Sequence, residues 1–139
     1  MLRRSIERLC VADHGHDPGI LAQWLANKTP EMFCAWLHQP ENSVLVAAGN
    51  GAILAVGAVS HAGRITLNYV APEARFQGVS RALLAALEQR AVQHGNAECT
   101  LISTRTARRF YLSAGYVETG SPENSFGTGA GYPMRKPLS

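Results

Sequence analysis

The residues best suited to chemistry lie in a short loop between an expected strand and an expected helix. The strand ends at Pro72, and the helix starts near Ser80. A helix N-terminus presents unpaired backbone N–H groups and the positive end of the helix dipole. Gly78 lets the backbone approach a ligand closely, and Arg75 and Arg81 add positive charge. The loop therefore predicts a cradle for a pyrophosphate group.

The same loop could also be a plain connection between a strand and a helix, with solvated arginines. Two common phosphate-binding motifs are excluded. The Walker loop G-x-x-x-x-G-K-(S/T) does not occur in the chain. The dinucleotide-binding fingerprint G-x-G-x-x-G is also missing. The glycines at 127, 129 and 131 have the wrong last spacing and do not lead from an expected strand into an expected helix.

Two segments together carry a family resemblance. The first reads Arg75-Phe76-Gln77-Gly78-Val79-Ser80. It resembles the acetyl-CoA-binding motif (R/Q)-x-x-G-x-(G/A) of the GCN5-related N-acetyltransferases (GNAT), with Ser80 where Gly or Ala is usual. The second, from Thr104 to Tyr116, is similar to the family's N-x-x-A-x-x-F-Y-x-x-x-G-(F/Y), with Thr104 in place of the frequent Asn. Both stand in the family's order and spacing, and the resemblance covers residues 43–137.

The resemblance implies an α/β fold with a mixed sheet that splays open between its fourth and fifth strands, with acetyl-CoA in the wedge. Main-chain groups around Leu67 to Val70 would bind pantetheine and polarise the thioester carbonyl, and the amides of residues 77–81 would hold the pyrophosphate. The residues expected to contact acetyl-CoA are Leu67, Tyr69, Val70, Arg75, Phe76, Gln77, Gly78, Val79, Ser80, Arg81, Thr104 and Ala107.

The family chemistry is acetyl transfer from acetyl-CoA to a primary amine of a small molecule or peptide, by direct attack in a ternary complex. A backbone N–H near a bulge in the fourth strand would stabilise the oxyanion. Tyr111, a phenol that is protonated at neutral pH, would donate to the leaving sulfur, although it could also be a core aromatic. The alternative function is a non-catalytic acyl-CoA-binding sensor or interaction module of the same fold.

No obvious general base accompanies this chemistry. Asn68 points near the cleft and could hold a water, while His61, Glu118 and Glu123 are more typical of surface residues. A water chain or an already neutral amine remains open.

Asn68 and the aromatic residues Trp36 and Phe126 are the residues expected to touch the acceptor. The pair His14 and His16 has a metal-compatible spacing but no third ligand, so we expect no metal, and Asp17 is better explained as a helix N-cap.

The elements that must position these residues follow the order β-αα-βββ-α-β-α-ββ, in one domain over residues 1–139. Helix openings are expected at Asp17-Pro18 and Thr29-Pro30. Hydrophobic periodicity and turn residues place strands at 6–12, 44–48, 53–59, 65–70, 99–103, 116–119 and 132–138, helices at 80–94 and 107–113, and a loop at 121–131. Because of its two prolines, the last strand is expected to be short or at an edge.

The charge distribution and the cysteines restrict the classes of binding partner and the compartment that can be expected. The net charge of +3 comes from residues 64–109, which hold seven arginines against three acidic residues, and this pattern favours one local anion over a nucleic acid. The three cysteines include no C-x-x-C pair, which favours free thiols in a reducing cytoplasm. Neither a membrane helix nor a signal peptide is expected. Since the family often dimerises, a homodimer is also considered.

Overall fold

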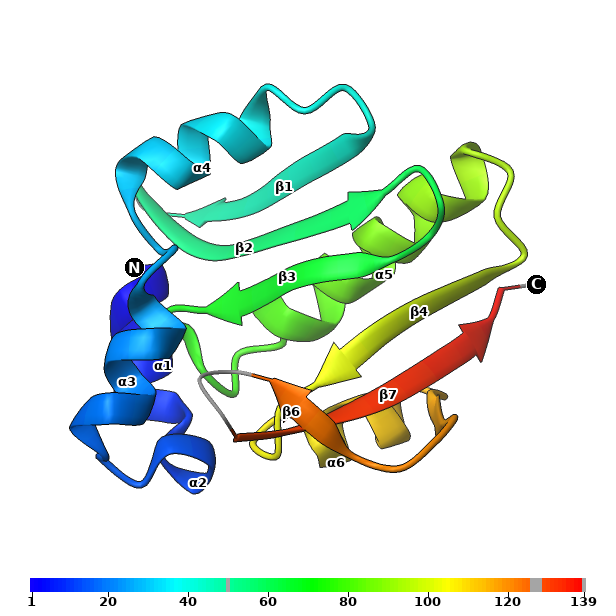
Figure 1. Ribbon diagram of the computed structural model, residues 1–139. Helices are drawn as coiled ribbons and strands as arrows, with labels where there is room; N and C mark the ends of the chain where they lie inside the picture. Colours follow the sequence, from blue (N-terminus) through cyan, green and yellow to red (C-terminus); the bar gives the residue numbers. More distant parts are fainter. Residues whose placement is uncertain (50, 126–128, 139) are drawn as a thin grey trace.

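Two mainly antiparallel sheets lie side by side and diverge from one another (Figure 1). The computed structural model describes residues 1–49, 51–125 and 129–138. The first sheet has the order β1-β2-β3, from β1 (Asn42–Gly49), β2 (Ala52–Ser60) and β3 (Ile65–Val70). The second has the order β4-β7-β5, from β4 (Glu98–Ser103), β7 (Gly129–Pro137) and β5 (Val117–Glu118), and β6 (Glu123–Ser125) pairs with β7.

The two sheets meet at one place. Arg64 forms an isolated parallel bridge with Thr100, whose N–H donates to the carbonyl of Gly63 at 3.0 Å. Gly63 has φ of +82°, and a Cβ there would lie 2.6 Å from the carbonyl oxygen of Glu98, so this close approach requires glycine. Along the described parts of β3 and β4 this is the only bridge, and the strands diverge beyond it (Figure 1). The expected splay is therefore confirmed.

Helix α5 (Val79–Gln93) covers one face of the first sheet, and α6 (Arg108–Ser113) packs into the same core. Gly57 on β2 faces α5 so closely that a Cβ would lie 2.8 Å from the side chain of Leu87. The 3₁₀ helix η1 (Pro72–Ala74) leads from β3 towards α5. Buried residues that join both sheets and both helices are Ala55, Val59, Ile65, Leu83, Leu84, Leu87, Ala91, Cys99, Leu101, Tyr111, Tyr116, Tyr132 and Met134.

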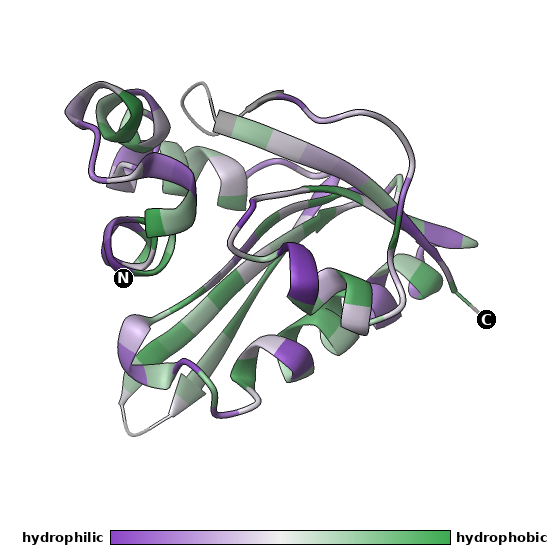
Figure 2. Ribbon diagram, turned by 90° about the horizontal axis from the view of Figure 1, so that it is seen from below, coloured by the Kyte–Doolittle hydropathy of each residue, from purple (hydrophilic) through white to green (hydrophobic). Residues whose placement is uncertain are grey.

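The strand expected at residues 6–12 is wrong. The chain instead forms α1 (Leu2–Leu9) and α2 (Val11–His14). Ile6 and Cys10 are four residues apart, so a helical turn places both on the face that packs against Trp24 and Leu25. The spacing of apolar residues in this segment fits both the two-residue period of a strand and the 3.6-residue period of a helix. Packing against Trp24 and Leu25 favours the helix. Figure 2 shows the N-terminal helices gathered beside the sheets.

The next two helices open as expected. The Asp17 side chain accepts hydrogen bonds from the N–H groups of Gly19 and Ile20 at the start of α3 (Pro18–Leu25). Thr29 accepts from the N–H of Met32 at the start of α4 (Pro30–Leu37). In both helices proline occupies the first position, where no N–H is required.

The end of the chain differs from expectation. Part of the expected loop at 121–131 is strand, because β6 pairs with the start of β7. Two of the three paired residues of β7 are glycines, which have no side chain. The segment therefore lacks the alternation of apolar side chains by which a strand is predicted. Strand β7 is also nine residues long and central, rather than short or at an edge. Pro133 takes part through its carbonyl, which accepts from the N–H of Thr119 at 2.9 Å.

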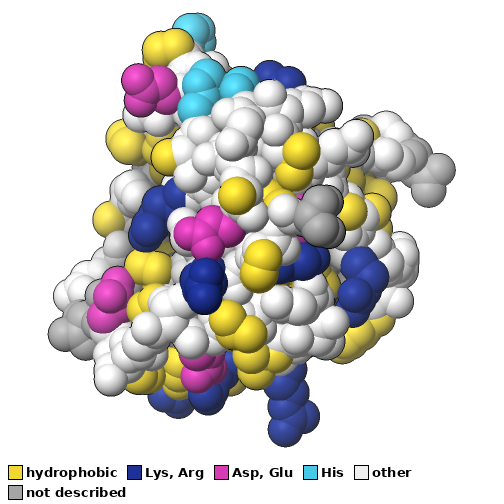
Figure 3. All heavy atoms as spheres, turned by 90° about the vertical axis from the view of Figure 1, so that its right-hand side faces the viewer, with side chains coloured by type: hydrophobic (Ala, Val, Ile, Leu, Met, Phe, Trp, Pro, Cys, Tyr) yellow, Lys and Arg dark blue, Asp and Glu magenta, His cyan; other side chains and the backbone are white. Residues whose placement is uncertain are grey.

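Charges are mixed on the face that looks away from the N-terminal helices. Figure 3 shows basic and acidic side chains interspersed there among hydrophobic and uncharged atoms. Among the described residues, Lys136 pairs with Glu88 at 3.1 Å, and Arg135 pairs with Glu98 at 3.2 Å. In the described part of the chain, no helix is both long and apolar enough to cross a bilayer.

Candidate active site

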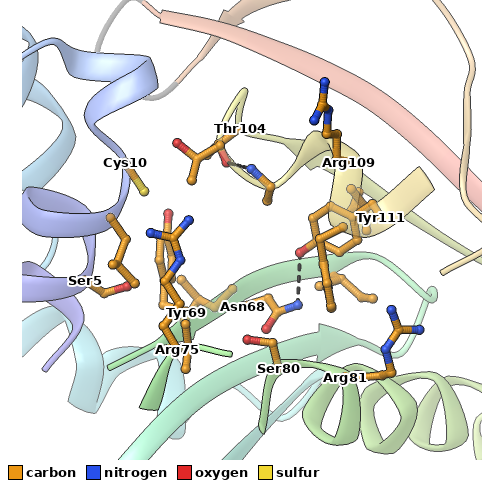
Figure 4. Close-up of a pocket in the computed structure, with 18 of the residues that line it drawn as sticks. Ser5, Cys10, Asn68, Tyr69, Arg75, Ser80, Arg81, Thr104, Arg109 and Tyr111 are labelled. Atoms are coloured by element: carbon orange, nitrogen blue, oxygen red, sulfur yellow. Dashed lines mark hydrogen bonds between the residues drawn. The ribbon is translucent and has the colours of Figure 1, made fainter. Parts of the chain in front are cut away.

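A cavity of about 740 Å³ opens where β3 and β4 diverge. Its walls come from α1, β3, the loop before α5, the end of β4, and α6 with the turn before it (Figure 4). Of the residues expected to bind acetyl-CoA, all except Gln77 and Val79 line this cavity. The structure thus brings the two sequence motifs together on opposite walls of one space.

The loop at one end of the cavity leaves a helix N-terminus open. Gly78 is the N-cap of α5 with φ of +77°, and no side chain caps the helix. The first-turn N–H groups are therefore available to an anionic ligand. Arg75 and Arg81 line the same end, and Phe76, with φ of +66°, is 91% exposed. An uncapped helix start and two arginines thus lie at the same end of the cavity.

At the centre of the cavity, Asn68 and Tyr111 face one another across the wedge. The Nδ2 amide of Asn68 donates to the Tyr111 hydroxyl at 3.0 Å (Figure 4). Burial raises the pKa of Tyr111 to about 12, against a smaller lowering by the bond from Asn68. The phenol is therefore protonated at neutral pH, and its own hydrogen is not used by Asn68.

The main chain of β3 presents polar groups to the wedge. The N–H of Ala71 donates to the carbonyl of Leu54 at 2.7 Å. Together with the β2–β3 register, this bond shows which residues of β3 are hydrogen-bonded to β2. Since bonded and non-bonded pairs alternate, the main chain of Tyr69 points towards β2, and that of Asn68 and Val70 points towards the wedge. The register shifts beside Thr66, so a bulge lies at this end of the strand, as expected.

Helix α1 supplies a wall that the sequence reasoning missed. Ser5, Leu9 and Cys10 line the cavity. Burial, with a smaller effect of Asp13, raises the pKa of the Cys10 thiol to about 12, so it is not a thiolate at neutral pH. The spacing of Ile6 and Cys10 was the available sign of a helix here.

Asp13 ties the N-terminal helices to the opposite wall. Its carboxylate accepts from the backbone N–H groups of Arg105 and Thr106 at 2.6 and 3.0 Å, and from the Thr106 hydroxyl. Thr104 in turn accepts from the N–H of Ala107 at 3.0 Å and caps the turn that leads into α6. Asp13 therefore positions the 104–107 segment of the cavity wall.

Replacing Asp13 with alanine is expected to lower the free energy of unfolding by about 3 kcal/mol, because bonds to a carboxylate are strong and their donors would stay unpaired. The matched variant Asp17→Ala removes only a helix cap and should cost about 1 kcal/mol. Urea denaturation of both variants checks this, and equal losses would contradict the positioning role of Asp13.

Of the residues expected to contact the acceptor, Asn68 lines this cavity and Trp36 does not. Trp36, on α4, lines a second cavity of about 400 Å³ instead. Phe126 lies outside the described residues. Among the candidate bases, His61 stacks on His94 with ring centroids 3.9 Å apart, and Glu118 pairs with Arg108.

Neither these candidates nor Glu123 lines the main cavity, and none of the described residues that do is a histidine or a carboxylate. The ring of His14 is already engaged, since Nε2 lies 2.9 Å from the carbonyl of Ile6 and Nδ1 accepts from the N–H of His16. Within residues 1–49, 51–125 and 129–138, no three metal-binding side chains gather.

Comparison with known proteins identifies the family. The model of the acetyltransferase (GNAT) domain matches residues 6–138. A GCN5-related N-acetyltransferase from Rhodopseudomonas palustris is 25% identical, with a TM-score of 0.85 over 99% of this chain and 85% of that chain. No curated protein matches the chain in sequence.

Two further structures share the fold. The PaiA N-acetyltransferase from Thermoplasma acidophilum, solved with coenzyme A, is 16% identical, with a TM-score of 0.79 over 99% of this chain and 88% of that one. The ribosomal-protein-S18-alanine N-acetyltransferase from Escherichia coli is 21% identical, with a TM-score of 0.67 over 86% and 88%. A family match over nearly the whole chain thus agrees with the splayed sheets and the cavity between them, and the protein belongs to the GNAT acetyltransferase family.

Proposed function

We propose that the protein is an N-acetyltransferase that moves an acetyl group from acetyl-CoA to a primary amine of a small molecule or peptide. The observation that carries this proposal is the Tyr111 hydroxyl, which accepts a hydrogen bond from Asn68 inside the cavity between β3 and β4. The donor groups suit coenzyme A, because an uncapped helix start can bind its phosphates and the free main chain of β3 can bind its pantetheine amides.

The chemistry follows from these positions. The amine attacks the thioester carbonyl, a C–N bond forms, and the N–H of Asn68 or Val70 stabilises the developing oxyanion. The C–S bond then breaks, and Tyr111 gives its proton to the departing sulfur. Because none of the described cavity residues is a histidine or a carboxylate, the amine proton leaves through water, and water returns a proton to the Tyr111 phenolate. Both substrates are bound at once, in a ternary complex.

Asn68 sets the direction of the Tyr111 proton. Since its amide donates to the phenol oxygen, the phenol hydrogen is left for the sulfur. Asn68→Leu removes this donor and is expected to lower kcat about tenfold. Asn68→Asp replaces the donor with an acceptor that turns the Tyr111 proton away, and it should lower kcat further.

Steady-state release of the thiol at saturating acetyl-CoA measures both effects. In the Tyr111→Phe background, where no phenol remains, Asn68→Leu should change kcat less than twofold. Independent, multiplying effects of the two substitutions would contradict this role of Asn68.

The proposed function is tested by following thiol release, and acetylated product by mass spectrometry, over a panel of small amines and peptides with free amino groups. Turnover of at least one amine supports it. Tight binding of acetyl-CoA without turnover of any amine would favour the non-catalytic binding module of the same fold.

A further inference from the structure

A second cavity adjoins the reacting end of the first. It measures about 400 Å³ and lies between the α3–α4 connection, α4 and the first sheet. Thr66 and Leu67 of β3 line both cavities, and Leu67 directly precedes Asn68, whose amide holds Tyr111. None of the described phosphate-loop residues lines it. A molecule in the second cavity would therefore reach the wedge beside the thioester rather than beside the phosphates.

Lys28 is the only cationic residue among the described residues that line this cavity, and hydrogen bonds hold its backbone. Its N–H donates to the carbonyl of Leu25 at 3.0 Å. Arg3 donates to the carbonyls of Leu25 and Lys28 at 2.9 and 3.2 Å, which ties the α3–α4 connection to α1. The Lys28 side chain is thus presented from a fixed connection.

Among the described residues, the Lys28 ammonium forms no ion pair. It donates to the neutral Asn27 side chain at 2.6 Å and lies 5.9 Å from the centre of the Trp36 ring. No carboxylate of the described residues comes within 4.0 Å of it. Partial burial lowers the pKa of Lys28, so an incoming anion would regain part of the lost solvation.

We infer that the second cavity binds a carboxylate of the acceptor through Lys28, so that the acceptors are amines that also carry a carboxylate. This inference rests on the proposed function. A single ammonium suits a single negative charge. Glu41, which lines the same cavity, repels any anion, and it opposes a doubly charged phosphate about twice as strongly as a carboxylate. Trp36 provides a flat apolar wall for the carbon chain between amine and carboxylate.

The test compares substrates that differ only in this charge. Glycylglycine is paired with glycylglycinamide, and β-alanine with β-alaninamide, and kcat/KM is expressed per uncharged amine to remove the difference in amine pKa. The wild-type protein should favour each carboxylate about tenfold or more, the size expected of a hydrogen bond to a charged group.

Lys28→Met keeps a similar side-chain length over Trp36 and should abolish this preference by slowing the carboxylates alone. Arg64→Met is the matched control, since it removes an equal charge from an exposed residue that lines neither cavity, and it should keep the preference. A preference that is absent in the wild type, or retained in Lys28→Met, overturns the inference while the proposed function stands. Absence of acetylation of every amine overturns the proposed function itself.

Discussion

Tyr111→Phe is expected to lower kcat by about a hundredfold to a thousandfold, with little change in the Kd for acetyl-CoA. The phenol supplies one proton in the transition state, and proton transfer of this kind contributes about 10²–10⁴ in rate. The ring itself stays, so the cavity wall and the core are preserved. Thiol release at saturating substrates and calorimetric titration with acetyl-CoA measure the two quantities.

Tyr132→Phe is the matched control for this substitution. Tyr132, on β7, is a buried tyrosine like Tyr111 but does not line the cavity, so the loss of its hydroxyl should leave kcat unchanged. Equal turnover of Tyr111→Phe and the wild type would remove the acid role.

The pH dependence follows from the same group. Because burial raises the pKa of Tyr111 to about 12, the proton donor is not lost at pH 9–10, where a free phenol begins to ionise. A folded pKa above the unfolded value also means that Tyr111 contributes stability below pH ~10, and that this contribution disappears as the pH rises towards 12. Tyr111→Phe should lose less stability than the wild type over this pH range, because other buried groups with raised pKa values, such as Cys10 and Cys99, titrate in both proteins.

Gly78→Val is expected to weaken acetyl-CoA binding by about tenfold to a hundredfold. A φ of +77° costs a side-chain-bearing residue about 1–2 kcal/mol, and a β-branched one more, so the loop before α5 must shift. That shift moves the N–H groups that would bind the pyrophosphate. By contrast, Arg81→Ala removes an exposed charge from the same end of the cavity and should weaken binding only a few-fold.

Gly95→Val is the control that separates the effect of Gly78→Val on acetyl-CoA binding from its effect on the stability of the fold. Gly95 has φ of +84°, lies beyond the far end of α5, and lines neither cavity, so the variant carries the same backbone cost without touching the loop. Both glycine variants should lose similar thermal stability, and only Gly78→Val should bind acetyl-CoA poorly. A larger loss of affinity in Arg81→Ala than in Gly78→Val would contradict the backbone cradle.

The sequence motifs predicted that Tyr111 and the loop before α5 belong to one site, and both line the same cavity, because the residues of each motif are neighbours in the chain. They did not predict the bond between Asn68 and Tyr111, which spans 43 residues and depends on the angle between two sheets. The clamp of Asp13 on Arg105 spans 92 residues, and no local pattern marks it.

The error at residues 6–12 has a similar cause. A segment of seven residues is too short for apolar spacing to separate a strand from a helix, and the decision comes from Trp24 and Leu25, against which Ile6 and Cys10 pack. The missed α1 wall of the cavity follows directly from that error.

The bridge between Arg64 and Thr100 joins the two sheets, and the cavity residues on its two sides come from different parts of the chain. The described cavity residues that precede β4 come from α1, β3, the loop before α5 and the start of α5, and those from β4 onward come from β4, the following turn and α6 (Figure 1). The phosphate loop and Asn68 belong to the first group, and Tyr111 belongs to the second. A molecule bound in the wedge would therefore contact two consecutive halves of the polypeptide and hold them together. Each half alone supplies only some of the residues that line the cavity.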